Sequence, residues 1–248
     1  FPDSIIVAGG LHPTACPDEA LQTGHIDYVV RGEGEEVMLQ LHRSLRGGAD
    51  PARLKGVSFT RDGRIVHTPE APLIPELDDI PMFPYELFDN PKYDMAFITS
   101  SRGCPYKCTY CSQRMLTGTT YRYKSAGRIV QELDVLVNRY GQKQIVFYDD
   151  NFCFKAKRVS EVCSAIIDAG LHKKCTFSVQ TRADNFPPDM VPILAAAGFT
   201  HAGFGMETGV NRLAQLIGKG ETVEQHLEAV DLGKRHGFDV SLFMIFGL

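Results

Sequence analysis

The stretch Ser101-Arg-Gly-Cys-Pro-Tyr-Lys-Cys-Thr-Tyr-Cys111 decides how this sequence is interpreted. Its cysteines, with C-x3-C-x2-C spacing, are Cys104, Cys108 and Cys111. Three thiolates in one loop can bind zinc, copper(I) or an iron–sulfur cluster. A closed structural zinc site needs a fourth protein ligand, and this loop contains no histidine. On a four-iron cluster, three thiolates would leave one iron open for a substrate or cofactor.

Two simpler interpretations use the same residues. Free cysteines are often small buried hydrophobic side chains, and a zinc knuckle also binds through closely spaced cysteines. Three cysteines within eight residues, together with Pro105 and Tyr110, do not form an ordinary core pattern. We therefore favour an iron–sulfur loop over structural thiols or a zinc knuckle.

The loop resembles that of the radical S-adenosylmethionine (SAM) superfamily, including the aromatic Tyr110 directly before the third cysteine. The resemblance implies a four-iron four-sulfur (4Fe-4S) cluster on the three cysteines, with SAM at the open iron. It further implies that one electron from the cluster cleaves SAM, and that the 5′-deoxyadenosyl radical takes a hydrogen atom from a small-molecule substrate. An external donor such as a flavodoxin or ferredoxin would supply the electron. The sequence identifies no catalytic acid or base.

Composition excludes several other classes. The 248 residues are 44% hydrophobic and 23% charged, with a net charge of −4. This mild acidity gives no reason to expect a nucleic-acid partner, and no apolar run reaches the roughly 18–20 residues of a membrane helix. Seven cysteines, an odd number, favour the reducing cytoplasm over a disulfide scaffold. The chain begins at Phe1 and stops as a strand finishes, so we expect a fragment of a longer protein.

The first part of the chain alternates strands and helices, as open α/β sheets do. Such elements are expected over residues 4–8, 17–21, 27–30 and 35–45. The segments Gly9-Gly-Leu-His-Pro-Thr14, expected to be a loop, and Ile26-Asp-Tyr-Val-Val-Arg-Gly-Glu-Gly-Glu35 resemble the last portion of a cobalamin-binding domain found before many radical SAM cores. The resemblance implies the C-terminal part of a Rossmann-like domain over residues 1–48, which would bind cobalamin through Gly9, Gly10, Thr14, Gly32 and Gly34.

His12 is not assigned to cobalt. Cobalamin-binding domains of this kind often carry a D-x-H-x-x-G motif whose histidine binds the metal, and that motif does not occur in this sequence. We interpret His12 as a loop histidine in an ordinary polar environment.

Residues 49–93 are expected to connect two domains. Val57–Thr60 and Arg64–His67 flank Asp62-Gly63, which is a strong hairpin signal. Prolines then follow too densely for a long helix, at Pro69, Pro72, Pro75, Pro81, Pro84 and Pro91. The segment is predicted to be a hairpin followed by an extended linker.

Residues 94–248 show a repeating β/α pattern. Strands are predicted over residues 95–99, 144–148, 175–179, 202–206 and 239–246, and helices over residues 125–140, 156–169, 188–197 and 222–237. Ser125 can cap the first of these helices, and Thr222-x-x-Gln225 fits a capping box for the last. The predicted fold class is α/β: a partial (β/α) barrel of radical SAM type, truncated after its fifth strand and preceded by the Rossmann-like part.

Polar or glycine-bearing clusters follow every predicted strand, and chemistry in α/β barrels gathers at the carboxyl ends of strands. Position by position, the resemblance assigns Asp150 to the amino group of SAM and Arg182 to its carboxylate. A guanidinium offers the paired donors that a carboxylate accepts. Taken alone, Asp150 could instead be a helix cap and Arg182 a surface ion pair.

The resemblance assigns the remaining parts of SAM to three of these clusters. Glu207, in a G-x-E motif, and Gln180 would bind the ribose hydroxyls, although Glu207 alone could be an ordinary loop carboxylate. Tyr110 and Phe246 would contact the adenine ring. Gly205 would let the main chain approach the cofactor closely.

The leading hypothesis is a cobalamin-dependent radical SAM enzyme, a methyltransferase or cyclase on an unknown substrate. One alternative is a radical SAM enzyme that does not use cobalamin. A methylthiotransferase would carry a cysteine-bearing front domain, and Cys16 alone lies upstream of the loop. The alternative of a different class is a non-catalytic iron–sulfur or zinc module, which would need no aligned charges at the strand ends.

Overall fold

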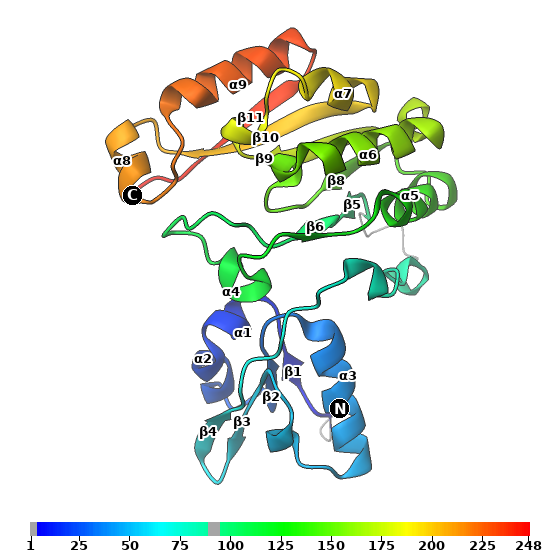
Figure 1. Cartoon of the computed structure of the whole chain (residues 1–248). Coiled ribbons are helices and arrows are strands. Elements are labelled where there is room, and N and C mark those ends of the chain that lie inside the picture. The colour runs from blue at the N-terminus through cyan, green and yellow to red at the C-terminus, as the bar shows by residue number, and fades with distance from the viewer. Residues whose placement is uncertain (1–3, 89–94) are drawn as a thin grey trace. The chain divides into compact units, whose positions relative to one another are not determined.

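The computed structural model describes residues 4–88 and 95–248 (Figure 1). The chain divides into two compact units. The first runs to Pro75 and includes Gly103–Pro105 and Cys111–Thr120; the second holds Glu76–Arg102, Tyr106–Tyr110 and Tyr121–Leu248. The predicted boundary between residues 93 and 94, and Pro91, lie outside the described residues.

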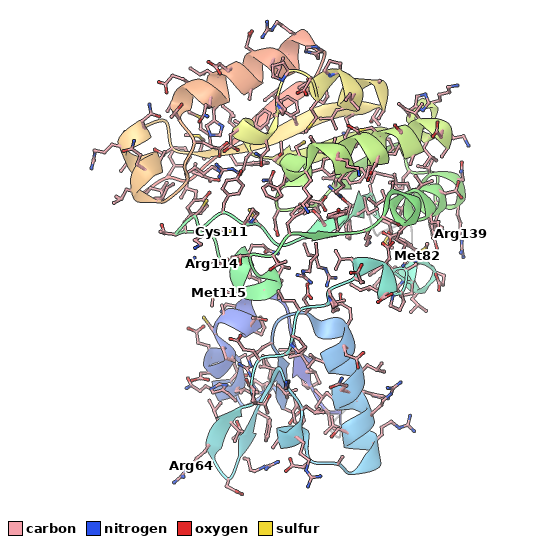
Figure 2. All side chains as sticks on the ribbon, in the orientation of Figure 1. Arg64, Met82, Cys111, Arg114, Met115 and Arg139 are labelled. Atoms are coloured by element: carbon pink, nitrogen blue, oxygen red, sulfur yellow. The ribbon has the colours of Figure 1, made fainter. Side chains whose placement is uncertain are left out.

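The first unit is built on a four-stranded sheet in the order β1-β2-β3-β4. β1 (Val7–Ala8) pairs in parallel with β2 (Tyr28–Val30), and β3 (Val57–Arg61) and β4 (Arg64–His67) continue the sheet antiparallel. The predicted hairpin is confirmed, and its turn residues Asp62 (φ 50°) and Gly63 (φ 71°) both have the left-handed backbone of a tight turn. Arg64 extends from the hairpin tip in Figure 2.

The hairpin belongs to the first sheet rather than to a separate linker. Its Val57 and Phe59 are buried against Val30, Val37 and Leu41. Because the apolar face of β3 completes this core, the first unit extends well past the predicted division at residue 48.

The described residues of the first unit contain four helices. They are α1 (Leu11–Ala15), α2 (Pro17–Gln22), α3 (Gly34–Gly47) and α4 (Gln113–Thr117), and a 3-10 turn covers Pro51–Arg53. The expectation of a loop over residues 9–14 is therefore wrong from Leu11 onward, where the backbone forms a short helical turn. Gly48 ends α3 with a left-handed backbone (φ 68°).

The second unit is built on a five-stranded parallel sheet in the order β11-β10-β9-β8-β5. These strands are β5 (Phe97–Ile98), β8 (Gln144–Phe147), β9 (Thr176–Thr181), β10 (Phe199–Glu207) and β11 (Asp239–Met244). Each strand lies beside its predecessor in the chain, which confirms the repeating β/α pattern. The short strands β6 (Ser101–Arg102) and β7 (Arg122–Tyr123) pair separately, antiparallel.

Five helices connect these strands: α5 (Ala126–Asp134), α6 (Ala156–Asp168), α7 (Val191–Ala196), α8 (Asn211–Leu216) and α9 (Val223–Arg235). A π-helical turn over Val135–Arg139 continues α5. Shorter 3-10 turns cover Leu77–Asp79, Tyr85–Phe88, Phe152–Phe154, Leu171–Lys173 and Ala183–Asn185. The Ser125 cap and the Thr222–Gln225 capping box are confirmed, whereas α8 was not predicted.

Helices α5, α6, α7 and α9 pack on the sheet of the second unit through one apolar core (Figure 1). At its centre, the rings of Phe147, Phe152, Phe177 and Phe199 contact one another and are almost completely buried. Burying each such side chain contributes about 1.5–3 kcal/mol. Because this core packs against the strands, it fixes the positions of the residues at their carboxyl ends. No helix in the described ranges is long and apolar enough to span a membrane.

Candidate cofactor site

The approach to the cysteine loop is anchored by Asp149, at the carboxyl end of β8. Its carboxylate Oδ1 accepts hydrogen bonds from the backbone N–H of Ser100 (2.6 Å) and of Ser101 (2.9 Å). The hydroxyl of Ser100 donates to Oδ2 of the same carboxylate. Asp149 is buried, so it orients the backbone that leads from β5 towards the first cysteine.

Arg158 of α6 balances this buried carboxylate. Its Nη2 lies 3.5 Å from Oδ2 of Asp149. Its Nη1 donates to the carbonyl of Phe152 (3.0 Å) and to the hydroxyl of Tyr121 (3.1 Å). Arg158 is only 2% exposed, and a buried charge of this kind needs a partner. Neither Asp149 nor Arg158 was assigned a role from the sequence.

Tyr110 connects the cysteine loop to the fourth strand of the barrel-type sheet. Its hydroxyl donates to Oε1 of Glu207, at the end of β10, over 2.8 Å. Burial and this hydrogen bond raise the pKa of Tyr110 well above its ordinary value, so the phenol remains a donor. The prediction that Tyr110 contacts adenine stays a prediction.

The end of β10 has an unusual backbone. Glu207 has a left-handed φ of 64°, and the ladder to β11 is irregular between Gly205 and Glu207. A Cβ on Gly205 would collide with the Glu207 carboxylate and lie 3.1 Å from Nζ of Lys219. Glycine at position 205 therefore makes room for the two charged side chains.

Arg182, which follows β9, is tied to neighbouring residues. Both carboxylate oxygens of Asp184 accept from its guanidinium, at 2.9 and 2.8 Å. Its Nη1 donates to the carbonyl of Lys219 (2.9 Å) and lies 3.3 Å from Glu221. Burial alone would lower the pKa of Arg182, but Asp184 and Glu221 raise it above its ordinary value. The guanidinium lies against the Tyr106 ring, 3.6 Å from its centroid.

Glu221 brings the cations of this region together. The side chain is completely buried, and its Oε2 lies 3.2 Å from Nζ of Lys219 as well as near Arg182. Its Oε1 accepts the backbone N–H of Asp184 (3.1 Å). Nζ of Lys219 is also 3.6 Å from Oε1 of Glu207. Lys219 and Glu221 lie between α8 and α9 rather than at a strand end, so a search of strand ends missed both.

Two further polar residues join the strand ends. The side-chain amide of Asn151, after β8, donates to Asn185 (2.6 Å), and its oxygen accepts from the hydroxyl of Thr181 at the end of β9 (2.7 Å). Asn185 in turn hydrogen-bonds to the hydroxyl of Tyr106. The ends of β8 and β9 and the cysteine loop are thereby linked by side chains.

The other predicted SAM contacts lie around this network with different exposure. Asp150 is exposed and directly follows the buried Asp149, and Gln180 is half-buried beside Gly203. Phe246 is 94% exposed. The assigned roles of these residues stay predictions.

In the first unit, the two segments predicted to bind cobalamin lie together. The hydroxyl of Thr14 accepts the backbone N–H of Gly32 (3.1 Å), and the N–H of Thr14 donates to the carbonyl of Gly10 (3.1 Å). Gly10 (φ 90°) and Gly32 (φ 77°) both have left-handed backbones that favour glycine. A Cβ on Gly9 would lie 3.4 Å from the carbonyl oxygen of Val30, and one on Gly34 would lie 3.6 Å from the Val30 side chain.

The cysteines of the loop are thiols, not disulfides. Cys108 belongs to the second unit and is buried, whereas Cys104 and Cys111 belong to the first unit and are partly exposed. Cys111 lies close before α4, which carries Arg114 and Met115 (Figure 2). Three thiols in one loop fit the donor set of an iron–sulfur cluster. The carboxylate of Glu207 and the ammonium of Lys219, beside Tyr110, fit the ribose and the amino-acid part of SAM.

The α/β fold has counterparts among known proteins. Residues 98–248 match the Radical SAM superfamily, and this match covers more than half of the chain. The chain therefore belongs to the radical SAM superfamily, whose members use a 4Fe-4S cluster and SAM.

Relatives extend the similarity to almost the whole chain. An uncharacterised methyltransferase of Pyrococcus horikoshii is 33% identical over 98% of this chain and 54% of its own length. The anaerobic magnesium-protoporphyrin IX monomethyl ester cyclase of Rubrivivax gelatinosus is 30% identical over 100% of this chain and 46% of its own length. The chain thus spans about half the length of these relatives.

Solved structures confirm the fold class. The cobalamin-dependent SAM radical enzyme OxsB, with aqua-cobalamin and SAM bound, matches with a TM-score of 0.84 at 21% identity, over 98% of this chain and 36% of its own. The radical SAM methyltransferase TsrM from Kitasatospora setae, with cobalamin and a [4Fe-4S] cluster bound, matches with a TM-score of 0.81 at 19% identity, over 99% of this chain and 50% of its own.

Proposed function

We propose that this chain is part of a cobalamin-dependent radical SAM enzyme, a methyltransferase or cyclase that acts on a small molecule. The observation that carries the proposal is the contact between Tyr110 and Glu207. It joins the cysteine loop to the strand-end motif in which SAM contacts were predicted. A non-catalytic cluster module would have no need for this contact or for the buried charges around it.

Cys104, Cys108 and Cys111 would hold the cluster, and the reduced cluster would supply the electron that cleaves SAM. An external electron donor, such as a flavodoxin or ferredoxin, would have to deliver that electron. A cytoplasmic location agrees with reduced thiols and stays a prediction.

Lys219 is the cation that we propose for the carboxylate of SAM. Its ammonium lies 3.6 Å from Glu207 and 3.2 Å from Glu221, so both carboxylates orient it. Arg182 was predicted for this role, but Asp184 and the Lys219 carbonyl already accept from three of its five N–H donors. We propose instead that Arg182 positions Lys219.

Glu207 would bind the ribose hydroxyls. Tyr110 donates to Oε1, and Lys219 approaches the same oxygen, so this carboxylate is held in one orientation. A fixed acceptor loses less conformational entropy when a ligand binds than a mobile side chain does.

Cobalamin use is supported by the two solved structures described above and by the first unit. Proteins similar to this chain include methyltransferases and a porphyrin cyclase, and the two solved structures described above contain cobalamin. We propose that the segments joined by Thr14 and Gly32 contact the corrinoid. No residue of this chain is proposed as a cobalt ligand.

The cluster is tested by anaerobic reconstitution with iron and sulfide. We expect about four irons per chain, with most of the iron lost in Cys108→Ala. Reduction in the presence of SAM should then release 5′-deoxyadenosine or demethylated SAM. Tight zinc binding by the same cysteines without visible absorption would refute the cluster.

SAM binding is tested with Lys219→Met, and Lys234→Met on the exposed side of α9 serves as the matched control. We expect at least a tenfold loss of SAM affinity in the first variant at unchanged iron content. A tenfold loss corresponds to about 1.4 kcal/mol of binding free energy. Equal affinity in the two variants would refute the role of Lys219. A longer form of the protein that takes up no corrinoid would favour the radical SAM enzyme without cobalamin.

A further inference from the structure

A group of three potential metal ligands lies in the first unit and has no part in the proposed function. His12, Cys16 and Glu19 each offer one ligand atom, and these atoms all lie within 4.8 Å of one another. Nε2 of His12 is already 3.3 Å from Oε2 of Glu19. The interpretation of His12 as an ordinary loop histidine does not account for this convergence.

The local backbone explains why these three side chains meet. Cys16 follows His12 by four residues, and Glu19 follows Cys16 by three, which are the spacings that place side chains on one face of a helix. Cys16 both ends α1 and precedes α2, whose first residue is Pro17. The N–H of Cys16 donates to the carbonyl of His12 (2.8 Å), so the helical turn continues up to this cysteine. The convergence therefore follows from the fold of nine consecutive residues, 11–19.

The donor set suits zinc. Zinc accepts thiolate sulfur, imidazole nitrogen and carboxylate oxygen, whereas calcium and magnesium prefer oxygen alone. Tetrahedral zinc, with bonds of about 2.0–2.3 Å, places its ligand atoms about 3.3–3.8 Å apart. Binding zinc would require side-chain rotations that shorten the separations, at most 4.8 Å, to that value.

Little opposes such a rotation. The side chains of His12 and Glu19 are 71% and 69% exposed, so they move without disturbing the core. Their ion pair is a surface contact, which contributes at most about 1 kcal/mol.

We propose that His12, Cys16 and Glu19 form a zinc site with a water molecule as the fourth ligand. The thiol of Cys16 loses its proton to solvent when the metal binds. Zinc at this position fixes the junction between α1 and α2, which lie next to each other in Figure 1. The site shares no cysteine with the cluster loop and does not depend on the proposed function.

The test is the rate of alkylation of Cys16, followed by mass spectrometry on the full chain with its cluster reconstituted. This readout is specific to one residue, so zinc bound elsewhere does not affect it. We expect one equivalent of zinc to slow the alkylation of Cys16 at least tenfold. His12→Ala and Glu19→Gln should abolish most of this protection.

Asp18→Asn provides the matched control. Asp18 neighbours Glu19 in the sequence but faces Nε2 of His67, at 3.0 Å, so this variant should keep the protection. A chromophoric chelator titrated against the same proteins should find one zinc fewer per chain in His12→Ala than in the unchanged protein.

The proposal is overturned if one equivalent of zinc leaves the rate unchanged, or if His12→Ala is protected as well as the unchanged protein. Iron content and SAM affinity are measured on the same samples. Normal values of both, together with an unprotected Cys16, would refute the zinc site and leave the proposed enzyme untouched.

Discussion

Replacing Asp149 by Asn tests whether the buried carboxylate behind the cysteine loop holds that loop in place. Asn has nearly the same shape but no charge, so Arg158, at 3.5 Å and 2% exposed, loses its counter-ion. Removing one partner of a buried ion pair costs about 3–5 kcal/mol. The amide also places an N–H group among the donors of Ser100 and Ser101. We expect unfolding to require about 4 kcal/mol less free energy.

Urea denaturation followed by circular dichroism measures this loss, because the chain contains no tryptophan for fluorescence. With a slope of about 3 kcal/mol per molar urea, the midpoint should fall by about 1.3 M. Asp168→Asn, the same change at an exposed position in the same unit, should leave the midpoint unchanged. Iron content after reconstitution should fall in Asp149→Asn, because the start of the loop loses its anchor.

A double-mutant cycle with Arg158→Met separates the ion pair from the backbone hydrogen bonds. If the ion pair matters, the double variant should be more stable than the sum of the two single losses predicts. A shift smaller than about 0.3 M in Asp149→Asn, or strictly additive losses, would refute the argument that this pair is coupled.

Three further changes probe the charged side chains and the core. Gly205→Ala should lower SAM affinity about tenfold at unchanged iron content, because its Cβ displaces the Glu207 carboxylate and Lys219; unchanged affinity in a calorimetric titration would contradict this. Tyr110→Phe removes the donor to Glu207 and should destabilise the protein by about 2 kcal/mol in urea, and a neutral result would show that solvent replaces the phenol. Burial raises the pKa of Cys153 from 9.0 to about 12, so the folded state keeps a proton that the unfolded chain loses. This thiol should therefore lower the free energy of unfolding by up to about 1.4 kcal/mol per pH unit between pH 9 and 12. Urea midpoints measured across this range should fall less steeply in Cys153→Ala.

Local chemistry made the regular elements predictable. Asp62-Gly63 favours a left-handed turn whatever the surroundings, and the Thr222–Gln225 pair satisfies N–H groups within its own helix turn. Such signals act over four residues and survive tertiary packing. The helix α8 was missed because Asn211–Leu216 makes less than two turns and buries only Ala214, which is too little for a periodic pattern.

The roles of neighbouring polar residues were less predictable. Asp149 and Asp150 are identical in type and adjacent, yet the first is buried and the second exposed. Both residues follow the end of β8, at Phe147, and the sequence alone does not say which of the two side chains faces the loop. The prediction selected Asp150 as a ligand contact and left the anchor Asp149 without a role.

Glu221 lies near two cations, Arg182 and Lys219, and only Arg182 directly follows a strand. Arg182 follows β9 and was given the SAM carboxylate, which stays a prediction; Asp184 and the Lys219 carbonyl accept from three of the five N–H donors of its guanidinium. Lys219, in the segment after α8, is brought to the same place by its pairing with buried Glu221 at 3.2 Å. Because Glu221 faces both cations, it sets the distance between them, and neutralising it should move Lys219 away from Glu207. A cation contributed by a helix connection rather than by a strand becomes visible only when its partner carboxylate is located in space.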